Sequence, residues 1–339
     1  MNEVGFPLLG AAFVVLVVLP LCALAAKLGL MLLERDEAGG PLHGFNLRYL
    51  LLTGSGALPM AWLISAGLHQ AEQGAVAIAC LFDHATDICL EPAAFAAVLS
   101  VGAIGCWAHT LAGRTTASVS KTPRARALLR RLETIIASHP SLSSLVGRLR
   151  VTETPDFALG TQGMTHPMIF VGVSYAEALS EDALAGALGH ESEHVRAFDP
   201  LRYLVLELAL AMNPFGRKLL APHAYRWLAA REAHCDREAV LRGSLPLALA
   251  EAIVQAAKPS PNQAVALGAR DTTLLRFRVG LLFAFSEQRP HRCCHRGFSA
   301  FPIAMLLLLV TLFLPHETGT EALDALHTSA EHALVYAWR

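Results

Sequence analysis

Long uncharged apolar stretches flank a central region in which apolar and polar residues are mixed. Four of these stretches have about the length that an α-helix needs to cross a bilayer, roughly 20 residues. They are residues 4–26, 49–69, 92–113 and 297–316. The first lacks the basic start of a cleaved signal peptide, so we expect it to be retained as a membrane helix. The pattern therefore predicts three membrane helices, a soluble domain and a fourth membrane helix.

The composition strengthens this interpretation. Apolar residues make up 54% of the chain and charged residues 16%, whereas about a quarter of the residues in an ordinary soluble domain are charged. We therefore expect the lipid bilayer to surround much of the protein. The formal net charge is −1, so no global field favours nucleic acid, and we expect no direct nucleic-acid binding.

Charges in the connecting segments predict which side of the membrane each segment occupies. Residues 114–131 include six basic and no acidic residues, whereas residues 70–91 include four acidic and no basic ones. Basic loops stay in the cytoplasm, so we expect the first segment inside and the second outside. The fourth apolar stretch follows Arg289, Arg292 and Arg296 and precedes an acidic tail, which predicts that both termini are external.

These observations divide the chain into four predicted parts. They are a membrane region at 1–113, a cytosolic domain at 114–296, a membrane helix at 297–316 and a short external tail at 317–339. The tail has the spacing of an amphipathic helix that lies on the membrane, and a solvated terminus fits it equally well. The cytosolic part is long enough to bury its own core, so we expect the chemistry there.

The cytosolic part has signals for both helices and strands. Strand character occurs in 148–152, 157–159 and 167–173, and helices are expected near 124–138, 180–198 and 222–242. Ser180 followed by Glu181 and Asp182 marks the start of the second helix, and Asp199-Pro200 is expected to end it. Residues 201–212 form either a core helix or a segment against the membrane. The predicted fold class is α+β, mainly helical with a small β-sheet.

The second of these helices carries a metal-binding pattern, His-Glu-Ser-Glu-His at 190–194. On an α-helix His190 and His194 lie about 40° apart on one face, one turn apart, so both imidazoles can reach one Zn²⁺. Glu191 lies beside them and can take a proton from a water that the metal activates. Glu193 points to another face, where a solvated or salt-bridged role is expected.

A catalytic zinc site needs a third protein ligand and an open position. Glu232 lies 38 residues after His194, and Asp236 lies one turn further on the same helical face. We assign Glu232 as the third ligand and expect Asp236 to orient a ligating histidine through its other ring nitrogen. The side chains of His234 and Cys235 point away from Glu232, so we expect packing or surface roles for them.

Residues 177–199 resemble the active-site helix of the gluzincin metallopeptidases. More narrowly, residues 213–215, Asn-Pro-Phe, and 231–237, Arg-Glu-Ala-His-Cys-Asp-Arg, resemble the BlaR/MecR-type antirepressor membrane peptidases. The resemblance implies the same ligands, His190, His194 and Glu232, with Glu191 as the base. Asp199 matches an acidic position of the family, where it either supports the site or simply ends the helix.

The resemblance also implies a bacterial inner membrane protein that cleaves a protein substrate on the cytosolic side, with a transcriptional repressor as one target. Those peptidases carry a large external sensor domain, whereas only 24 residues follow Pro315 here. Any stimulus is therefore expected to come through loop 70–91, the tail or a separate membrane sensor partner. The alternatives are a housekeeping peptidase for quality control or precursor processing, and a non-catalytic zinc-stabilised receptor or scaffold.

Two further sequence features are weaker signals. Residues 167–173, just before the active-site helix, are expected to form a strand whose free edge pairs with an extended substrate. Cys80 and Cys89 lie in the loop assigned to the oxidising side, where they form either a disulfide or two free thiols.

Overall fold

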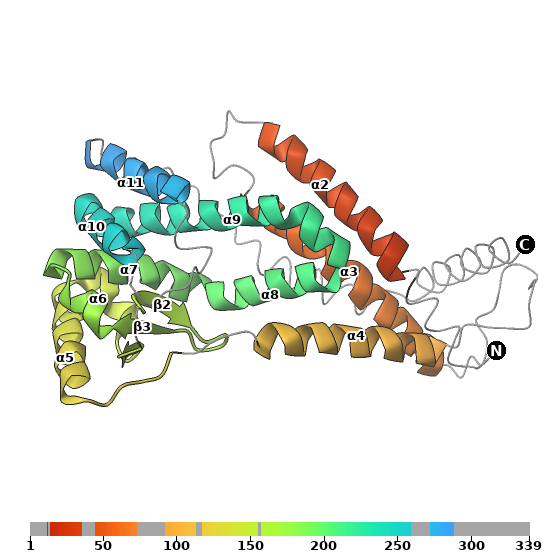
Figure 1. The fold of residues 1–339 in the computed structure, drawn as a ribbon, viewed down its shortest axis with the longest axis horizontal. Coiled ribbons are helices and arrows are strands. Elements are labelled where there is room, and N and C mark those ends of the chain that lie inside the picture. Colours follow the sequence, from red (N-terminus) through yellow and green to blue (C-terminus); the bar gives the residue numbers. More distant parts are fainter. Residues whose placement is uncertain are drawn as a thin grey trace, which may run out of the picture. The chain divides into compact units, whose positions relative to one another are not determined.

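The computed structural model describes residue 12 and residues 14–35, 45–72, 92–112, 117–154, 157–258 and 272–287 (Figure 1). The predicted fourth membrane helix, the tail, Cys80 and Cys89 lie outside these residues. The described part is mostly helical with one small sheet, which confirms the prediction of a mainly helical fold with a small β-sheet. By packing, the chain divides into two units, which we describe separately.

The first unit contains the described residues of Met1–Arg114 together with Leu204–Trp227. Its main elements are η1 (Val14–Val18), α2 (Leu19–Arg35), α3 (Phe45–Glu72), α4 (Pro92–Ala112) and parts of α8 (Asp199–Met212) and α9 (Pro214–Leu241). Leu19, Leu63 and Leu99 bring α2, α3 and α4 into one core. Asn213 joins α2 to the start of α9, because its amide donates to the Leu19 carbonyl at 2.6 Å and its side-chain oxygen accepts from Gly216 N–H at 2.8 Å.

Two described helices are long and apolar enough to cross a membrane, Val14–Arg35 and Phe45–Ser65. In α4 the apolar stretch Ala96–Leu111 is shorter than the other two. Large apolar side chains are exposed along α2 and α4, among them Leu21, Leu28, Leu32, Val101 and Ile104. The three predicted spans in this region are thus helices α2, α3 and α4, and two of them meet the length and composition of a membrane span.

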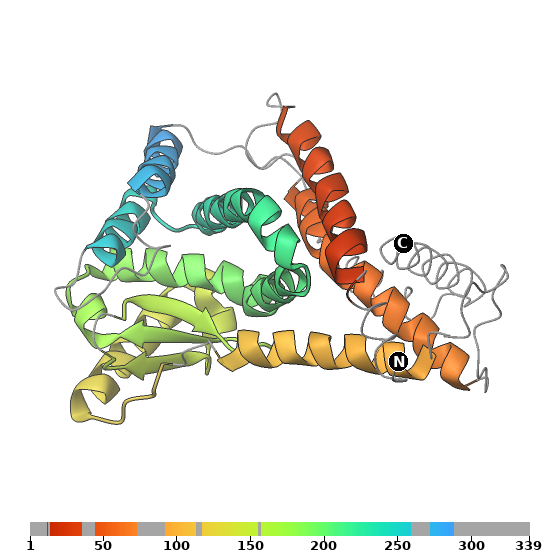
Figure 2. The same ribbon diagram turned by 45° about the vertical axis from the view of Figure 1, so that its right-hand side comes forward.

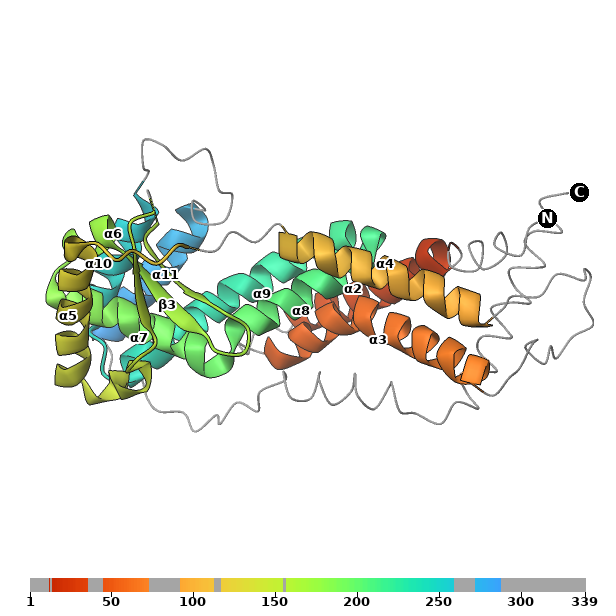
Figure 3. The same ribbon diagram turned by 90° about the horizontal axis from the view of Figure 1, so that it is seen from below.

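The second unit contains the described residues of Thr115–Tyr203 and Leu228–Arg296. Its helices are α5 (Pro123–Ser138), η3 (Pro140–Leu145), α6 (Val173–Glu177), α7 (Glu181–Ala197), α10 (Pro246–Ala257), α11 (Thr272–Glu287) and the remaining parts of α8 and α9. Leu132, Ile169 and Leu188 are fully buried in one core that joins α5, the sheet and α7. Figure 2 shows α7, in green, lying along the sheet. Helix α10 packs on α7, and α11 packs on α10 (Figure 3).

The sheet has the strand order β1-β3-β2, formed by β1 (Leu149–Thr152), β3 (Met168–Gly172) and β2 (Leu159–Gln162). Strand β3 pairs with β1 in parallel and with β2 in antiparallel orientation. The expectation that 167–173 has a free edge is therefore wrong, because β3 is the central strand and its backbone groups are used on both sides. Strand β2 occupies the edge instead.

Helix α7 begins where the sequence predicts. The Ser180 hydroxyl accepts from Ala183 N–H at 3.2 Å, and Glu181 and Asp182 lie in the first turn. The helix ends at Ala197, and Phe198 takes a left-handed conformation with φ of 54°. A large side chain rarely adopts that conformation. The turn at Phe198 sends the chain into α8, so Asp199-Pro200 begins a helix as well as ending one.

The later helices differ more from the prediction. Helix α9 begins at Pro214 and contains Pro222, which was expected at its start. Residues 201–212 belong to α8, which contributes to the cores of both units. Helices α10 and α11 were not predicted at all, although α11 supplies a residue of the candidate site.

Candidate metal centre

His190 and His194 lie one turn apart on α7, and both are buried. Their Nε2 atoms are 3.0 Å apart. The chain forms a helix here because Ser180 caps it and alanine and leucine residues dominate its core face. The geometry confirms that the two imidazoles share one face, as the four-residue spacing predicts.

A buried carboxylate contacts the other nitrogen of each imidazole. His190 Nδ1 lies 2.8 Å from Asp236 Oδ1, and His194 Nδ1 lies 2.6 Å from Asp199 Oδ2. Both aspartates are fully buried. A carboxylate beside Nδ1 favours the tautomer with its hydrogen on Nδ1, and this tautomer directs the Nε2 lone pair into the space between the rings. Two lone pairs at 3.0 Å must share a proton or a cation.

Glu232, on α9, brings a third ligand group to this space. Its carboxylate oxygens lie 3.4 Å from His190 Nε2 and 3.6 Å from His194 Nε2. Gly189 leaves room for Ser244, in the turn after α9, since a Cβ at residue 189 would lie 2.3 Å from Ser244 Oγ. The predicted set of His190, His194 and Glu232 therefore converges on one point.

Glu191 also reaches this point. One nitrogen from each histidine and one oxygen of Glu191 lie within 4.8 Å of one another. Thr161 on β2 donates to Glu191 Oε2 at 2.6 Å, so one carboxylate oxygen is held by the strand. Sequence reasoning missed Thr161 because nothing in the local pattern marks a strand threonine as a neighbour of a residue 30 positions later.

Two arginines support the aspartates. Arg231 donates from Nε to Asp199 Oδ2 at 2.6 Å. Arg278, on α11, donates to both oxygens of Asp236 at 2.7 and 2.8 Å and lies 3.0 Å from Glu232 Oε2. These paired hydrogen bonds fix the plane of the Asp236 carboxylate, because guanidinium and carboxylate match in geometry. Neither arginine was predicted as part of the site.

The electrostatics follow from these contacts. Burial lowers the pKa of His190, but Asp236 and Glu232 outweigh it and raise the pKa to about 9. Burial likewise opposes the charge of His194, and Glu232 and Asp199 are among the groups that raise its pKa. The pKa of Glu232 lies well below its ordinary value, because the two histidines and Arg278 outweigh burial. The site thus favours positive charge between its carboxylates.

The remaining residues of the motif region have other roles. Glu193 is buried rather than solvated, and its Oε1 pairs with Arg242 at 2.8 Å and Arg196 at 3.6 Å. This is the salt-bridged alternative. Cys235 is fully buried with Sγ 3.6 Å from His194 Nδ1, so it has the packing role rather than the surface role of the two that were expected. His194, Asp199 and Cys235 form a second group of close ligand atoms.

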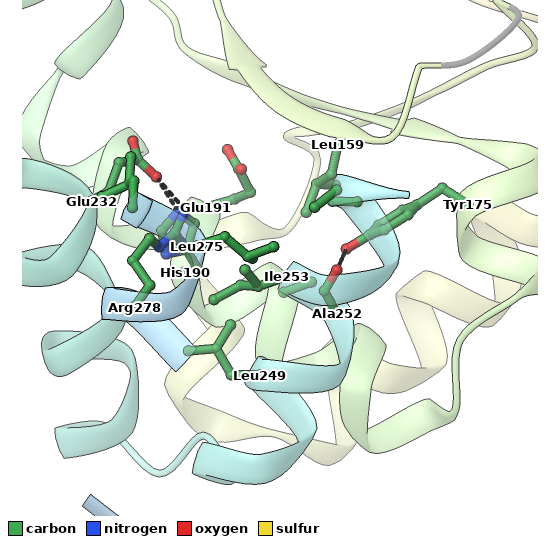
Figure 4. Close-up of a pocket in the computed structure, with 14 residues that line it drawn as sticks. Leu159, Tyr175, His190, Glu191, Glu232, Leu249, Ala252, Ile253, Leu275 and Arg278 are labelled. Atoms are coloured by element: carbon green, nitrogen blue, oxygen red, sulfur yellow. Dashed lines mark hydrogen bonds and ion pairs between the residues drawn. The ribbon is translucent and has the colours of Figure 1, made fainter. Parts of the chain in front are cut away.

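A cavity of about 210 Å³ opens beside His190. Its polar side is formed by His190, Glu191, Glu232 and Arg278, and its walls are mainly apolar (Figure 4). The apolar lining comes from β2, α6, α7, α10 and α11, and includes Leu159, Tyr175, Leu249, Ile253 and Leu275. Such a cavity fits a small apolar group next to the polar cluster.

The donor set matches what zinc takes in proteins. Two imidazole nitrogens and one carboxylate form the ligand set of several catalytic zinc sites, and the carboxylates on Nδ1 are the usual support for ligating histidines. Comparison with protein-family models, curated proteins and solved structures finds no match to this chain. The function is therefore inferred from the geometry of the site.

Proposed function

We propose that this chain is an integral membrane zinc metalloendopeptidase. The observation that carries the proposal is the pair of Nε2 atoms 3.0 Å apart, each on a ring whose Nδ1 contacts a buried aspartate. In this assignment His190, His194 and Glu232 hold the metal and Glu191 is the general base. Asp236 and Asp199 orient the histidines.

Each residue has a defined task in peptide hydrolysis. When bound, Zn²⁺ would polarise the scissile carbonyl and make the attacking water more acidic. Glu191 takes a proton from the water as the oxygen attacks the carbonyl carbon, then passes it to the nitrogen as the C–N bond breaks. Glu191 suits this task better than metal binding, because Thr161 already holds its Oε2 atom.

The substrate is proposed to be an extended protein segment. Strand β2 lies at the sheet edge and Leu159 belongs both to this strand and to the cavity lining. A segment that pairs with β2 would gain main-chain hydrogen bonds and place an apolar side chain in the cavity. This proposal replaces the expectation that 167–173 is the template, since β3 has no free edge.

We further propose that the metal centre faces the cytosol of a bacterial cell, in the inner membrane. The two membrane-length helices and the exposed apolar side chains of α2 and α4 support membrane association. The six basic residues of 114–131 support a cytosolic location for the domain that follows. Reporter fusions near residues 118 and 260 should read as cytosolic, and a fusion near 80 as external. An external signal at 260 would contradict a cytosolic substrate.

The regulated cleavage of a repressor-like protein remains one form of this proposal, and quality control or precursor processing is the other. Mapping of new protein termini in cells that carry the native chain or Glu191→Gln separates them. Regulated cleavage predicts few cleaved cytosolic proteins, whereas quality control predicts many cleaved membrane proteins.

The test of the enzyme proposal itself uses purified full-length protein with fluorescein-labelled casein. Native protein with zinc should cleave the casein. Cleavage should stop when a chelator removes the zinc and resume when zinc is restored. Glu191→Gln should retain zinc and lose cleavage. Equal cleavage by both proteins would contradict the proposal, and zinc without cleavage in either would favour a zinc-stabilised receptor or scaffold.

A further inference from the structure

Thr161 joins the edge strand of the sheet to the proposed general base. Its Oγ1 donates to Glu191 Oε2 at 2.6 Å, a short distance typical of a hydroxyl bonded to a charged carboxylate. Glu191 itself is only 7% exposed. In a site so shielded from water, this bond restricts the rotation of the carboxylate more than the same bond would at the surface.

The side chains of β2 alternate between the site and the opposite face. Leu159 lines the cavity, and Thr161, two residues on, reaches Glu191. Gln162, the next residue, accepts from Ala117 N–H at 3.1 Å. The two-residue period of a strand therefore places Leu159 and Thr161 together on the side of the metal centre.

The backbone of β2 alternates as well. Gly172 N–H donates to the Ala158 carbonyl at 2.7 Å, and Thr161 stands opposite Ile169 in the same register. In an antiparallel pair, hydrogen-bonded and non-hydrogen-bonded positions alternate. Leu159 and Thr161 therefore direct their N–H and C=O groups away from β3, toward the open edge. At Thr161, the main chain therefore faces the proposed substrate strand, while the side chain holds Glu191, the proposed base.

We infer that Thr161 is a positioning residue that aligns Glu191 for proton transfer and couples this alignment to strand β2. The inference rests on the proposed function. With Oε2 held by Thr161, Oε1 is the oxygen that accepts the proton of the attacking water and later gives it to the leaving nitrogen. Loss of the hydroxyl lets the carboxylate rotate, and small misalignments of reacting groups are costly to rates.

The test compares Thr161→Val, Thr161→Ser and a control on full-length protein with zinc. Valine keeps the branched shape and strand preference but lacks the hydroxyl, whereas serine retains the hydroxyl. Thr152→Val is the control, because Thr152 is a buried threonine of the same sheet whose hydroxyl contacts Thr154. The probe is fluorescein-labelled casein, and kcat, KM, zinc content and the thermal unfolding midpoint are measured for each protein.

We expect Thr161→Val to lower kcat by roughly 10- to 100-fold, with KM and zinc content unchanged. Thr161→Ser should restore kcat to within about threefold, and Thr152→Val should match the native kcat. A purely structural role would instead raise KM or lower zinc content, and serine would not rescue it.

Native kcat in Thr161→Val, or equal losses in the valine and serine variants, would overturn the inference while the proposed function stands. Absence of zinc-dependent cleavage in the native protein would overturn the proposed function, and this inference with it. The native protein therefore distinguishes the two failures.

Discussion

Each histidine of the metal centre is held by a chain of polar contacts that runs from the histidine to an aspartate and then to an arginine. The two chains of contacts have the same chemistry, but their residues come from different parts of the fold. His194 contacts Asp199, which pairs with Arg231. His190 contacts Asp236, which pairs with Arg278. The first chain uses an aspartate five residues after its histidine, whereas the second draws its aspartate and arginine from α9 and α11.

The two chains of contacts differ in how far apart their residues lie in the sequence and in how deeply their arginines are buried. Asp199 and Asp236 are both fully buried, but the side chain of Arg231 is 5% exposed and that of Arg278 14%. Arg278 also reaches Glu232, whereas Arg231 donates to the Glu193 carbonyl. The His194 side is thus held by Asp199 at the start of α8 and by Arg231 on α9, which also binds the α7 backbone, whereas the His190 side depends on the packing of α11. Stability should depend more on the first chain and metal affinity should be tunable through the second.

The largest expected effect is loss of the metal ion, because both chains of contacts support histidines that would bind it. His190→Ala, His194→Ala and Glu232→Ala should each reduce zinc from about one per chain to near none, because each removes a ligand. Metal analysis after dialysis measures this, with Glu191→Gln as the variant that keeps zinc. Full zinc content in Glu232→Ala would remove that residue from the ligand set.

The next effect separates the two chains by stability. Asp199→Asn removes the charge that faces Arg231 and should lower the free energy of unfolding of the metal-free protein by about 3–5 kcal/mol. Asp236→Asn should cost less, because Arg278 retains Glu232 at 3.0 Å. Unfolding in detergent with denaturant measures both. Equal losses, or a larger loss for Asp236→Asn, would contradict the comparison.

A smaller effect addresses the second chain through its arginine. Arg278→Met should weaken zinc affinity by about tenfold, because Asp236 and Glu232 lose the group that orients them. Arg276→Met is the matched control, since Arg276 is exposed on the same helix. Competition with a chromophoric chelator gives both affinities. If the two variants bind zinc equally well, α11 has no part in the metal centre.

The smallest expected effect is the release of protons when zinc binds. Since the pKa of His190 is raised to about 9, this ring holds an extra proton at pH 7 in the metal-free protein. The charge stabilises the metal-free fold fully below the ordinary pKa of 6.5, and this stabilisation is lost as the pH rises through 9. Zinc binding should therefore release at least one proton at pH 7 and fewer above pH 9. Calorimetry in buffers of different ionisation enthalpy would detect this, and no release at pH 7 would contradict it.

The sequence predicts the proposed ligands and Asp236 but misses the two arginines, and the reason is physical. The cap at Ser180, the four-residue spacing of the histidines and the same-face pair Glu232 and Asp236 are local helical properties. Arg278 lies 42 residues beyond Asp236, so only the tertiary packing of α11 brings them together. No local sequence pattern indicates that these two residues are neighbours in the fold.

The errors have similar causes. Strand 167–173 was correctly located. Its central place in the sheet depends on pairing with β1 and β2, and the sequence of one strand does not indicate its partners. Asp199-Pro200 signals the end of a helix, yet proline is also tolerated in the first turn of the next one.

X-ray absorption at the zinc edge tests the central claim most directly, because the structure brings together two groups of ligand atoms. If His190, His194 and Glu232 hold the metal, the spectrum of the full-length protein should fit nitrogen and oxygen neighbours at about 2.0–2.2 Å without sulfur. A sulfur neighbour at about 2.3 Å, lost in Cys235→Ser, would place the metal among His194, Asp199 and Cys235 and contradict the account.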